Sequence, residues 1–315
     1  KHKGQFMKLD RTTVAFGRHQ SFALRYSWLT KGYKALQINK NVFAGDDSTV
    51  TLGVGKNMVA SIHYWLKACQ IIDKTDEPTR IGKMLFDNGG FDPFLEDEAT
   101  IWLLHWLLVN NPSQSTAIYW FFNKFHKPVF TTEELATSLS DYIRDKRLGK
   151  QPTPGTVKKD ISLVTRMYSI SKPTGRAPLE DSLDSPMASL GLLVKASDAK
   201  HFIAKTDDRE SLPPLILGFS VLSLMKERGQ NSLPLDDLMY SRDDFTAIGA
   251  AFRLSENALI KKLEELISLY PGIFEIRDTA GIYQLYLLQK NKDPEDMLRE
   301  FYKPISHKGN AGVAA

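Results

Sequence analysis

The feature that most constrains the fold is a helix–glycine–helix pattern between residues 46 and 72. Asp46-Asp47-Ser48 is a helix start signal, and the turn Leu52-Gly53-Val54-Gly55 ends the short helix that follows it. A second helix is expected over 57–72, because its apolar residues recur at helical spacing and form one face. These residues are Met58, Ile62, Trp65, Leu66, Cys69 and Ile72. Two helices joined by a glycine turn are typical of a helix-turn-helix, which the sequence predicts here.

The same part of the chain carries most of the positive charge. Residues 1–72 contain eleven Lys and Arg against three Asp, which gives +8, whereas the rest of the chain contains 30 basic and 34 acidic residues, which gives −4. Lys and Arg release condensed counterions from phosphates, so this lobe favours a polyanion partner, above all double-stranded DNA. A solvated surface that happens to be basic is the alternative.

Composition excludes several classes of protein. Cys69 is the only cysteine, which excludes an intramolecular disulfide framework, a Cys-rich zinc finger and an iron–sulfur cluster, and fits a reducing cytosol. The longest apolar run, 99–109, is too short to span a bilayer and is expected to be a buried helix. We therefore expect a cytoplasmic protein with no membrane partner.

The expected fold class is mainly α, with multiple winged-helix or helix-turn-helix modules that carry small β-hairpin wings. Residues 1–90 are expected to form a basic, winged-helix-like DNA-binding module, in which 73–86 supplies the wing. Residues 91–170 are expected to form a helical domain with a second helix-turn-helix-like module, whose helices start at Thr131 or Thr132 and at Thr156. Residues 171–211, rich in Pro, Ser and Asp, are expected to be an irregular linker.

Residues 212–315 are expected to form a C-terminal winged-helix module. Helices are predicted over 215–228, 236–240, 243–252 and 256–270, and a hairpin over 273–277 and 282–288. The helix 256–270 mixes Glu256, Glu264 and Glu265 with Lys261 and Lys262. Because its charge is mixed, dimerisation or packing is favoured over DNA reading for this module.

The candidate DNA-binding residues lie in two groups. In the N-terminal lobe, five cations would neutralise phosphates, Asn57, Ser61 and Lys67 would face the groove, and His63 would be a phosphate or surface contact. The helix 156–168 supplies a second basic patch, for which a solvated face is an equal alternative. The candidates are Arg18, Arg25, Lys31, Lys34, Lys56, Asn57, Ser61, His63, Lys67, Lys158, Lys159 and Arg166.

Two further segments suggest chemistry. Residues 16–22 place Arg18 and His19 between two aromatic residues, and His19 is the candidate catalytic residue; a loop anchored by those aromatics is the alternative.

Asp87 and Asp92 are candidate ligands for Mg²⁺ or Mn²⁺, as in metal-dependent nucleases. A turn at Asp92 followed by acidic residues that open the next helix explains the same residues without a metal. No organic cofactor is expected.

Two stretches resemble the SspB-like family of bacterial DNA phosphorothioation (Ssp) antiphage systems: FGRHQSFALRYSWLTKGYKAL (16–36) and LGVGKNMVASIHYWLKACQII (52–72). The resemblance implies DNA binding and a DNA-nicking activity used during single-stranded sulfur modification. It also implies partners from the same pathway, namely a cysteine desulfurase, an ATPase and an ATP-pyrophosphatase. It carries over no catalytic residue, because no family catalytic motif is matched.

The function expected is therefore a DNA-binding protein that nicks DNA within such a system. The main alternative is a non-enzymatic adaptor, or transcription-factor-like protein, that recruits the modification enzymes to DNA. A protein-interaction scaffold with negligible affinity for DNA is the third class. A homodimer is plausible by analogy with other winged helices.

Overall fold

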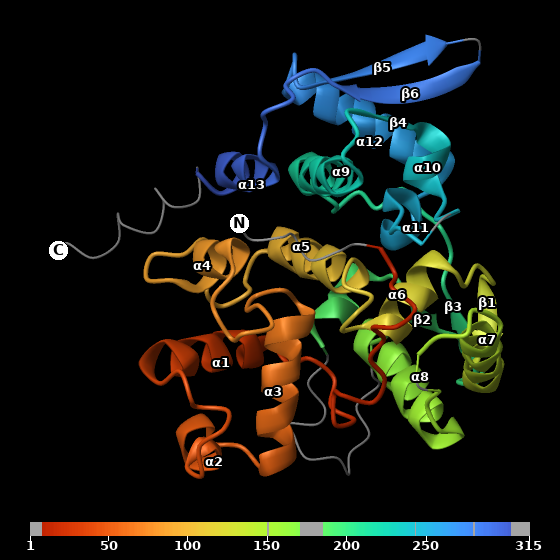
Figure 1. Ribbon diagram of the computed structural model, residues 1–315. Helices are drawn as coiled ribbons and strands as arrows, with labels where there is room; N and C mark the ends of the chain where they lie inside the picture. Colours follow the sequence, from red (N-terminus) through yellow and green to blue (C-terminus); the bar gives the residue numbers. More distant parts are fainter. Residues whose placement is uncertain (1–7, 150, 171–184, 243, 280, 304–315) are drawn as a thin grey trace. The chain divides into compact units, whose positions relative to one another are not determined.

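A computed structural model describes residues 8–149, 151–170, 185–242, 244–279 and 281–303 (Figure 1). The chain divides into two compact units, one formed by Leu9–Lys205 and the other by the residues from Thr206 onward together with Lys8. In the described part of the chain, no helix is both long and apolar enough to cross a bilayer. Each unit has its own core.

The first unit, Leu9–Lys205, is mainly helical and has one small sheet. Its helices are α1 (Tyr26–Ile38), α2 (Ser48–Leu52), α3 (Lys56–Ala68), α4 (Arg80–Phe86), α5 (Glu98–Val109), α6 (Thr116–Asn123), α7 (Thr132–Asp145), α8 (Pro154–Tyr168) and the 3₁₀ helix η2 (Pro186–Leu190). Its strands are β1 (Val129–Thr131), β2 (Val194–Lys195) and β3 (His201–Ile203), in the order β1-β3-β2, all antiparallel.

The core of this unit is built around α5 and α6. Every residue of α5 from Ala99 to Val109 is buried, as is every residue of α6, so both helices are apolar on all sides. His105 on α5 shares a hydrogen bond of 2.9 Å with the hydroxyl of Tyr168 on α8, and its ring packs edge-on against Phe122 of α6. The aromatic residues of these helices therefore join three helices into one core, as the buried run in the sequence predicts.

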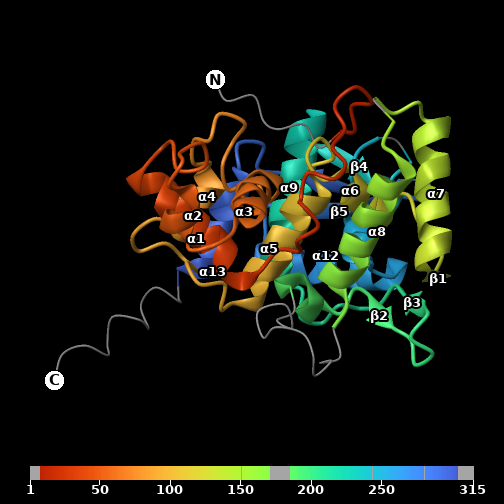
Figure 2. The same cartoon turned by 90° about the horizontal axis from the view of Figure 1, so that it is seen from below.

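Local capping explains where the helices of the sheet-bearing half begin. Thr131 and Glu134 form a reciprocal capping box at the start of α7, and the side chain of Thr153 accepts a hydrogen bond from the Thr156 amide at the start of α8. Pro154, the first residue of α8, has the backbone angle that a helix start needs. Helices α7 and α8 lie side by side in both views (Figures 1 and 2).

The second unit contains α9 (Pro214–Arg228), β4 (Ser232–Pro234), α10 (Leu235–Met239), α11 (Ile248–Phe252), α12 (Glu256–Leu269), β5 (Phe274–Thr279), β6 (Ile282–Leu287) and α13 (Pro294–Tyr302). Helix α9 is its centre, since every residue from Leu215 to Met225 is buried, and α12 and α13 pack against it. The sheet order is β4-β6-β5, and the hairpin register runs from Phe274 opposite Leu287 to Thr279 opposite Ile282.

The two units repeat one arrangement of elements. In the first, α6 is followed by β1, α7, α8, β2 and β3, with η2 inserted between α8 and β2. In the second, α9 is followed by β4, α10 with α11, α12, β5 and β6. In both sheets the first strand pairs with the last strand, which lies in the middle. A long capped helix, α8 or α12, precedes the final hairpin in each case.

The fold is mainly α, as predicted, but the structure departs from several local expectations. Of the predicted helix 243–252, α11 covers only Ile248–Phe252. Residues 73–86 do not form a wing, because 80–86 are helix α4, whose start is capped by the side chain of Thr79. Within 171–211, the residues up to 184 lie outside the described part, while 186–203 form η2 and the hairpin β2–β3 instead of a linker. The expected boundaries at 90 and 170 fall inside the first unit, and the one at 211 falls near the start of the second.

Candidate nucleic-acid interface

The exposed face of α8 is a narrow basic stripe. Lys158, Lys159, Ser162 and Arg166 are exposed, while Val157, Asp160, Ile161 and Val164 on the opposite side are buried. The exposed positions recur every three or four residues, so they lie along one side of the helix. No acid occupies this stripe, because Asp160, the one acid of the helix, points inward.

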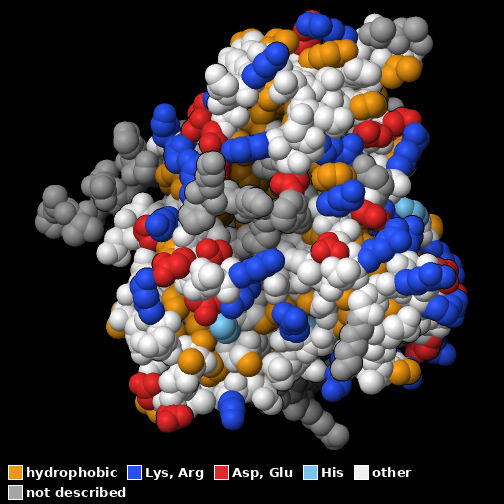
Figure 3. Space-filling model, viewed as in Figure 1, with side chains coloured by type: hydrophobic (Ala, Val, Ile, Leu, Met, Phe, Trp, Pro, Cys, Tyr) orange, Lys and Arg blue, Asp and Glu red, His pale blue; other side chains and the backbone are white. Residues whose placement is uncertain are grey.

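The hairpin β2–β3 adds exposed cations near the same helix pair. Lys195 and Lys200 are exposed, and together with Glu133 and Thr132 at the start of α7 they line a shallow hollow of about 450 Å³. Glu133 lies close enough to Lys158 for the two charges to interact: hydrogen bonds at the helix start, and then the charge of Lys158, lower the pKa of Glu133. Blue side chains are numerous at the right of Figure 3, where Figure 1 places α7 and this sheet.

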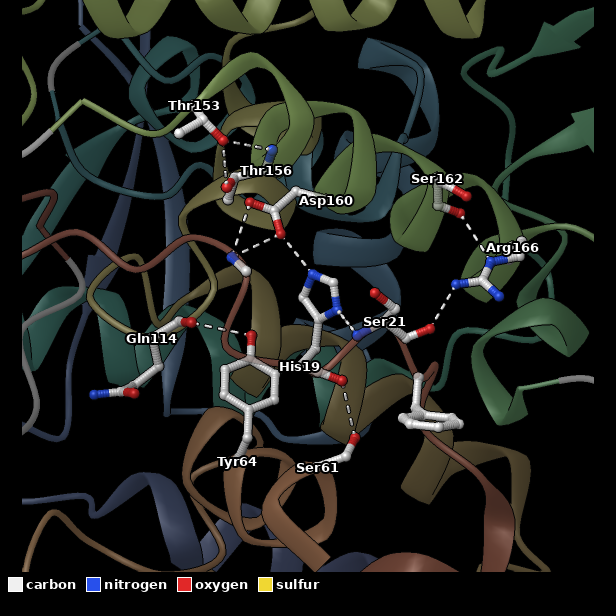
Figure 4. A network of polar contacts seen from close by, with 12 residues as sticks. His19, Ser21, Ser61, Tyr64, Gln114, Thr153, Thr156, Asp160, Ser162 and Arg166 are labelled. Atoms are coloured by element: carbon white, nitrogen blue, oxygen red, sulfur yellow. Dashed lines mark hydrogen bonds and ion pairs between the residues drawn. The ribbon is translucent and has the colours of Figure 1, made fainter. Parts of the chain in front are cut away.

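The buried side of α8 holds the loop at residues 16–22 in place. Asp160 accepts hydrogen bonds from the Gly17 amide at 2.9 Å and from His19 Nε2 at 2.5 Å. The Ser21 amide donates to His19 Nδ1 at 3.0 Å, and Ser61 Oγ on α3 donates to the His19 carbonyl at 3.1 Å. Figure 4 shows His19 between Asp160 on one side and Ser61 on the other.

These contacts define the tautomer of the His19 ring. Because Nδ1 accepts a hydrogen bond from a backbone amide, the ring proton lies on Nε2, which donates to the Asp160 carboxylate. Only 3% of His19 and 2% of Asp160 is exposed. Both ring nitrogens are engaged and shielded from solvent, so the pair anchors the loop. Chemistry at His19 would require one of these bonds to open, and a catalytic role for it stays a prediction.

The loop is held in a strained shape. Gly17 has φ +70°, and Gln20 and Ser21, which are not glycines, have φ +51° and +66°. Each such non-glycine residue costs about 1–3 kcal/mol, so neighbouring contacts must hold it there. Arg166 supplies one of these contacts, since its Nη2 donates to the Ser21 carbonyl at 2.8 Å. The basic helix and the loop therefore form one rigid surface, on which Arg18 is exposed.

The space behind this loop is closed. Arg18, His19, Tyr64 and Asp160 line a cavity of only about 10 Å³, too small for a nucleotide. Tyr64 donates to the Gln114 carbonyl at 3.0 Å, and burial, reinforced by the charge of Asp160, raises the pKa of its hydroxyl far above its usual range. Tyr64 therefore stays protonated and acts as a fixed wall. The accessible chemistry of this region is on its outer, basic surface.

The predicted phosphate contacts of the N-terminal lobe are at the surface. Arg18, Lys31, Lys34, Lys56 and Asn57 are exposed, and Arg25 is half-buried. The Arg25 guanidinium lies over Trp28 at 5.2 Å and the Lys34 ammonium lies over Phe94 at 4.9 Å. The charged groups of these side chains therefore lie at the surface. Phosphate contact by them stays a prediction.

The expectation that α3 presents a reading face to a DNA groove is wrong for Ser61. This residue is 0% exposed, because the 16–22 loop covers it. His63 and Lys67 both pair with Asp76, at 2.7 and 2.8 Å, and the His63 ring stacks on Phe43. Lys56 and Asn57 in the first turn of α3 are exposed, as is Ala60 in the next turn.

Asp87 and Asp92 do not fit a Mg²⁺ or Mn²⁺ site. Asp92 is buried, and its two oxygens accept the amides of Glu96 and Asp97, which is the turn that the sequence offers as the alternative. Asp87 accepts hydrogen bonds from Tyr33 and Gln37, both at 2.7 Å. Across the described residues, no group of three or more His, Cys, Asp or Glu side chains is placed to hold a metal ion.

Sequence reasoning missed Asp160 and the cations of the β2–β3 hairpin. Asp160 had a detectable signal, since helical spacing places it between Val157 and Val164 on the apolar side of α8. An acid on the buried side of a basic helix needs a partner. Lys195 and Lys200 carried no comparable signal, because β2 and β3 have only two and three residues.

Comparisons with known proteins agree with the architecture. A family model described as "Protein of unknown function (DUF4007)" matches residues 16–302. The chain is similar to a solved structure described as "SspB crystal structure", with a TM-score of 0.79, 29% identity, and coverage of 94% of this chain and 90% of that chain. It is similar to "Magnesium ion-bound SspB crystal structure", with a TM-score of 0.79, 27% identity, and coverage of 96% and 91%. No curated protein matches the chain. The resemblance to the SspB-like family is thus confirmed.

Proposed function

This chain belongs to the DUF4007 family, and from that premise we propose that it is a duplex-DNA-binding protein of a bacterial DNA phosphorothioation system. The similarity to SspB along nearly the whole chain supports the system, and the basic stripe of α8 supports the DNA. The partners implied by the sequence resemblance, a desulfurase, an ATPase and an ATP-pyrophosphatase, remain part of the proposal.

The α8 stripe is the observation that carries DNA binding. We assign residues 116–203 to a winged-helix module, in which α8 enters the major groove and the hairpin β2–β3 is the wing. Lys158 and Lys159 would bind phosphates or base edges, and Ser162 would lie over the groove. The exposed Lys195 and Lys200 on the wing would hold the flanking backbone.

The 16–22 loop adds a second contact to this surface. Asp160 in the middle of α8 and Arg166 near its end bind Gly17 and Ser21 of the loop, so these contacts hold the segment that carries the exposed Arg18 against the helix. A pre-ordered phosphate contact loses little entropy on binding. The exposed Lys56 and Asn57 at the start of α3 are assigned to the DNA backbone, because Ser61 further along the helix is buried and His63 and Lys67 pair with Asp76.

Binding of a fluorescent duplex in rising salt tests this proposal. Reversal of both Lys158 and Lys159 to Glu is expected to weaken binding and to reduce the slope of log affinity against log salt by about 2, since each lost phosphate contact removes about one counterion. Lys261→Glu, on α12, is the matched control and should leave the slope unchanged. Equal slopes for the wild type and the Lys158→Glu/Lys159→Glu variant would contradict the proposal.

Metal-dependent nicking of DNA is a second candidate function. It is favoured by the solved neighbour described as magnesium ion-bound SspB. Supercoiled plasmid with Mg²⁺ or Mn²⁺, with and without a chelator, distinguishes the two functions. Open circles that need the metal and disappear in His19→Gln, while that variant still binds the duplex, would establish a nickase that uses His19. Salt-dependent binding without open circles would support a non-enzymatic adaptor.

A further inference from the structure

The two repeated modules carry opposite surfaces at equivalent positions. Helices α8 and α12 align from their N-caps, Thr153 and Ser255, each of which accepts an amide three residues later. In this alignment the buried residues match in position: Val157 with Leu259, Asp160 with Lys262, Ile161 with Leu263, and Val164 with Leu266. The two helices therefore present the same side outward.

The outward residues differ in kind. Lys158, Lys159, Ser162 and Arg166 of α8 correspond to Ile260, Lys261, Glu264 and Ser268 of α12, all exposed. The first set carries three positive charges and no negative one, and the second carries one of each. Glu256 and Glu265 are also exposed on α12, so its surface is acidic and partly apolar. Such a face repels phosphates, and the DNA-binding role of α8 does not transfer to α12.

A groove lies where α12 meets α10 and the β5–β6 hairpin. Its volume is about 430 Å³, and its apolar lining includes Leu259, Ile260, Ile282 and Tyr283. Ile282 and Tyr283 at the start of β6 are 56% and 53% exposed, and Ile260 is 38% exposed. Figure 1 shows this hairpin beside α12, and orange side chains are visible over the hairpin in Figure 3. Three partly exposed large apolar side chains therefore lie along one groove.

The rim of the groove is acidic. Asp236, Asp237 and Glu256 line it with one cation, Arg242; both aspartates have an arginine partner, so Glu256 supplies the uncompensated negative charge. Arg242 pairs with Asp236 at 2.8 Å, and Arg228 pairs with Asp237 at 3.2 Å. Glu256 accepts a hydrogen bond from the Tyr240 hydroxyl and has no cation partner within the described residues. Glu264 continues the negative charge along the outward side of α12.

From this groove we propose that the C-terminal module docks a protein segment in which apolar side chains are flanked by Lys or Arg. The apolar side chains of that segment pack on Ile260, Ile282 and Tyr283, and its cations face Glu256 and Glu264. DNA is disfavoured because the rim is negative, and a second copy of this chain is disfavoured because the groove is not self-complementary in charge. The chain then holds DNA with one module and a protein with its repeat.

A displayed library of random peptides, selected on the full chain, tests the proposal. The expected winners combine apolar residues with a net positive charge. A selected peptide, made synthetically, should bind at least about tenfold more weakly to Tyr283→Glu and to Glu256→Lys than to the wild type. Its binding to the wild type should weaken in high salt. Lys158→Glu, at the position of α8 equivalent to Ile260, is the control and should bind the winner unchanged. Thermal unfolding of each variant shows that the module still folds.

Several results would overturn the proposal. The proposal is wrong if selection yields no family of peptides that combines apolar and basic residues. It is also wrong if a selected peptide binds Tyr283→Glu and Ile260→Glu as tightly as the wild type. Competition of duplex DNA with the winner, or loss of duplex affinity in Ile260→Glu, would make the groove a DNA surface. Sedimentation that shows a wild-type dimer and a Tyr283→Glu monomer would make the occupant a second copy. None of these outcomes depends on DNA binding by α8.

Discussion

His19 Nε2 lies 2.5 Å from Oδ1 of Asp160, although the two residues are 141 positions apart in the chain. The same carboxylate accepts the Gly17 amide, so one buried acid on α8 fixes both the backbone and the side chain of the 16–22 loop. The opposite side of α8 carries the exposed lysines. The shape of the loop and the position of the basic stripe are therefore coupled through Asp160.

Asp160→Asn is expected to lower the free energy of unfolding by about 3 kcal/mol. In the wild type the carboxylate accepts from the Gly17 amide and His19, whereas the side-chain N–H group of Asn cannot accept a hydrogen bond. Chemical denaturation of the variant and of Asp141→Asn, an acid on α7 whose side chain is 49% exposed, provides the comparison. The control should change by less than about 1 kcal/mol. A double-mutant cycle with His19→Gln should show coupling of at least about 0.5 kcal/mol. Additive effects would mean that the two residues do not act as a pair.

Gly32 is the point at which α1 crosses α3. A Cβ at this position would lie 2.5 Å from Ile62 Cγ2 and 2.9 Å from Leu66 Cδ1. Gly32→Ala should cost about 1–3 kcal/mol through overpacking, partly offset by the roughly 1 kcal/mol that alanine gains over glycine in a helix. Gly155→Ala in α8, where the nearest atom is 3.8 Å away, is the matched control and should not destabilise. Equal unfolding midpoints for both variants would refute the close crossing.

The pH dependence of stability should include a contribution from His63. Burial, which outweighs the hydrogen bond to Asp76, lowers the pKa of His63 below its ordinary value of 6.5. Between the folded and unfolded pKa values the unfolded chain binds a proton that the folded chain does not, so this stability is lost as the pH falls below about 6.5. Urea unfolding at several pH values should show a smaller acid loss for His63→Gln than for the wild type. Parallel curves would exclude this contribution.

Much of the helical framework was predictable because its signals are local. Helix starts are marked by Thr153 with Pro154 and by Ser255, and the end of α2 is marked by the glycine turn at 53–55. Each signal involves groups only a few residues apart. The hairpin β5–β6 was predictable as well, since an alternating run meets a turn signal. Strands β1, β2 and β3 were not predictable, because they have only two or three residues each. Strand β1 forms by pairing with β3, as between Val129 and Ile203, which are far apart in the chain.

The candidate site was predicted in its parts but not in its arrangement. Arg18, His19, Lys158 and Lys159 stand out by residue type, yet the contact between the loop and α8 depends on tertiary packing. The same packing explains the error at Ser61, whose polar side chain and helical position indicate exposure until a loop covers it. Charge alone pointed to the N-terminal lobe, whereas burial shows that α3 exposes Lys56 and Asn57 but covers Ser61.

We propose that α8 lies against DNA and that its counterpart α12 does not. Cys69 is the only cysteine and is fully buried, where burial raises the pKa of its thiol, so a thiol-directed iron chelate will label an introduced surface cysteine instead. Ser162→Cys on α8 and Glu264→Cys at the equivalent position of α12 make a matched pair. With an end-labelled duplex, the chelate at residue 162 is predicted to cleave the DNA and the chelate at residue 264 to leave it intact. Cleavage from residue 264 with none from residue 162 would contradict DNA binding by α8.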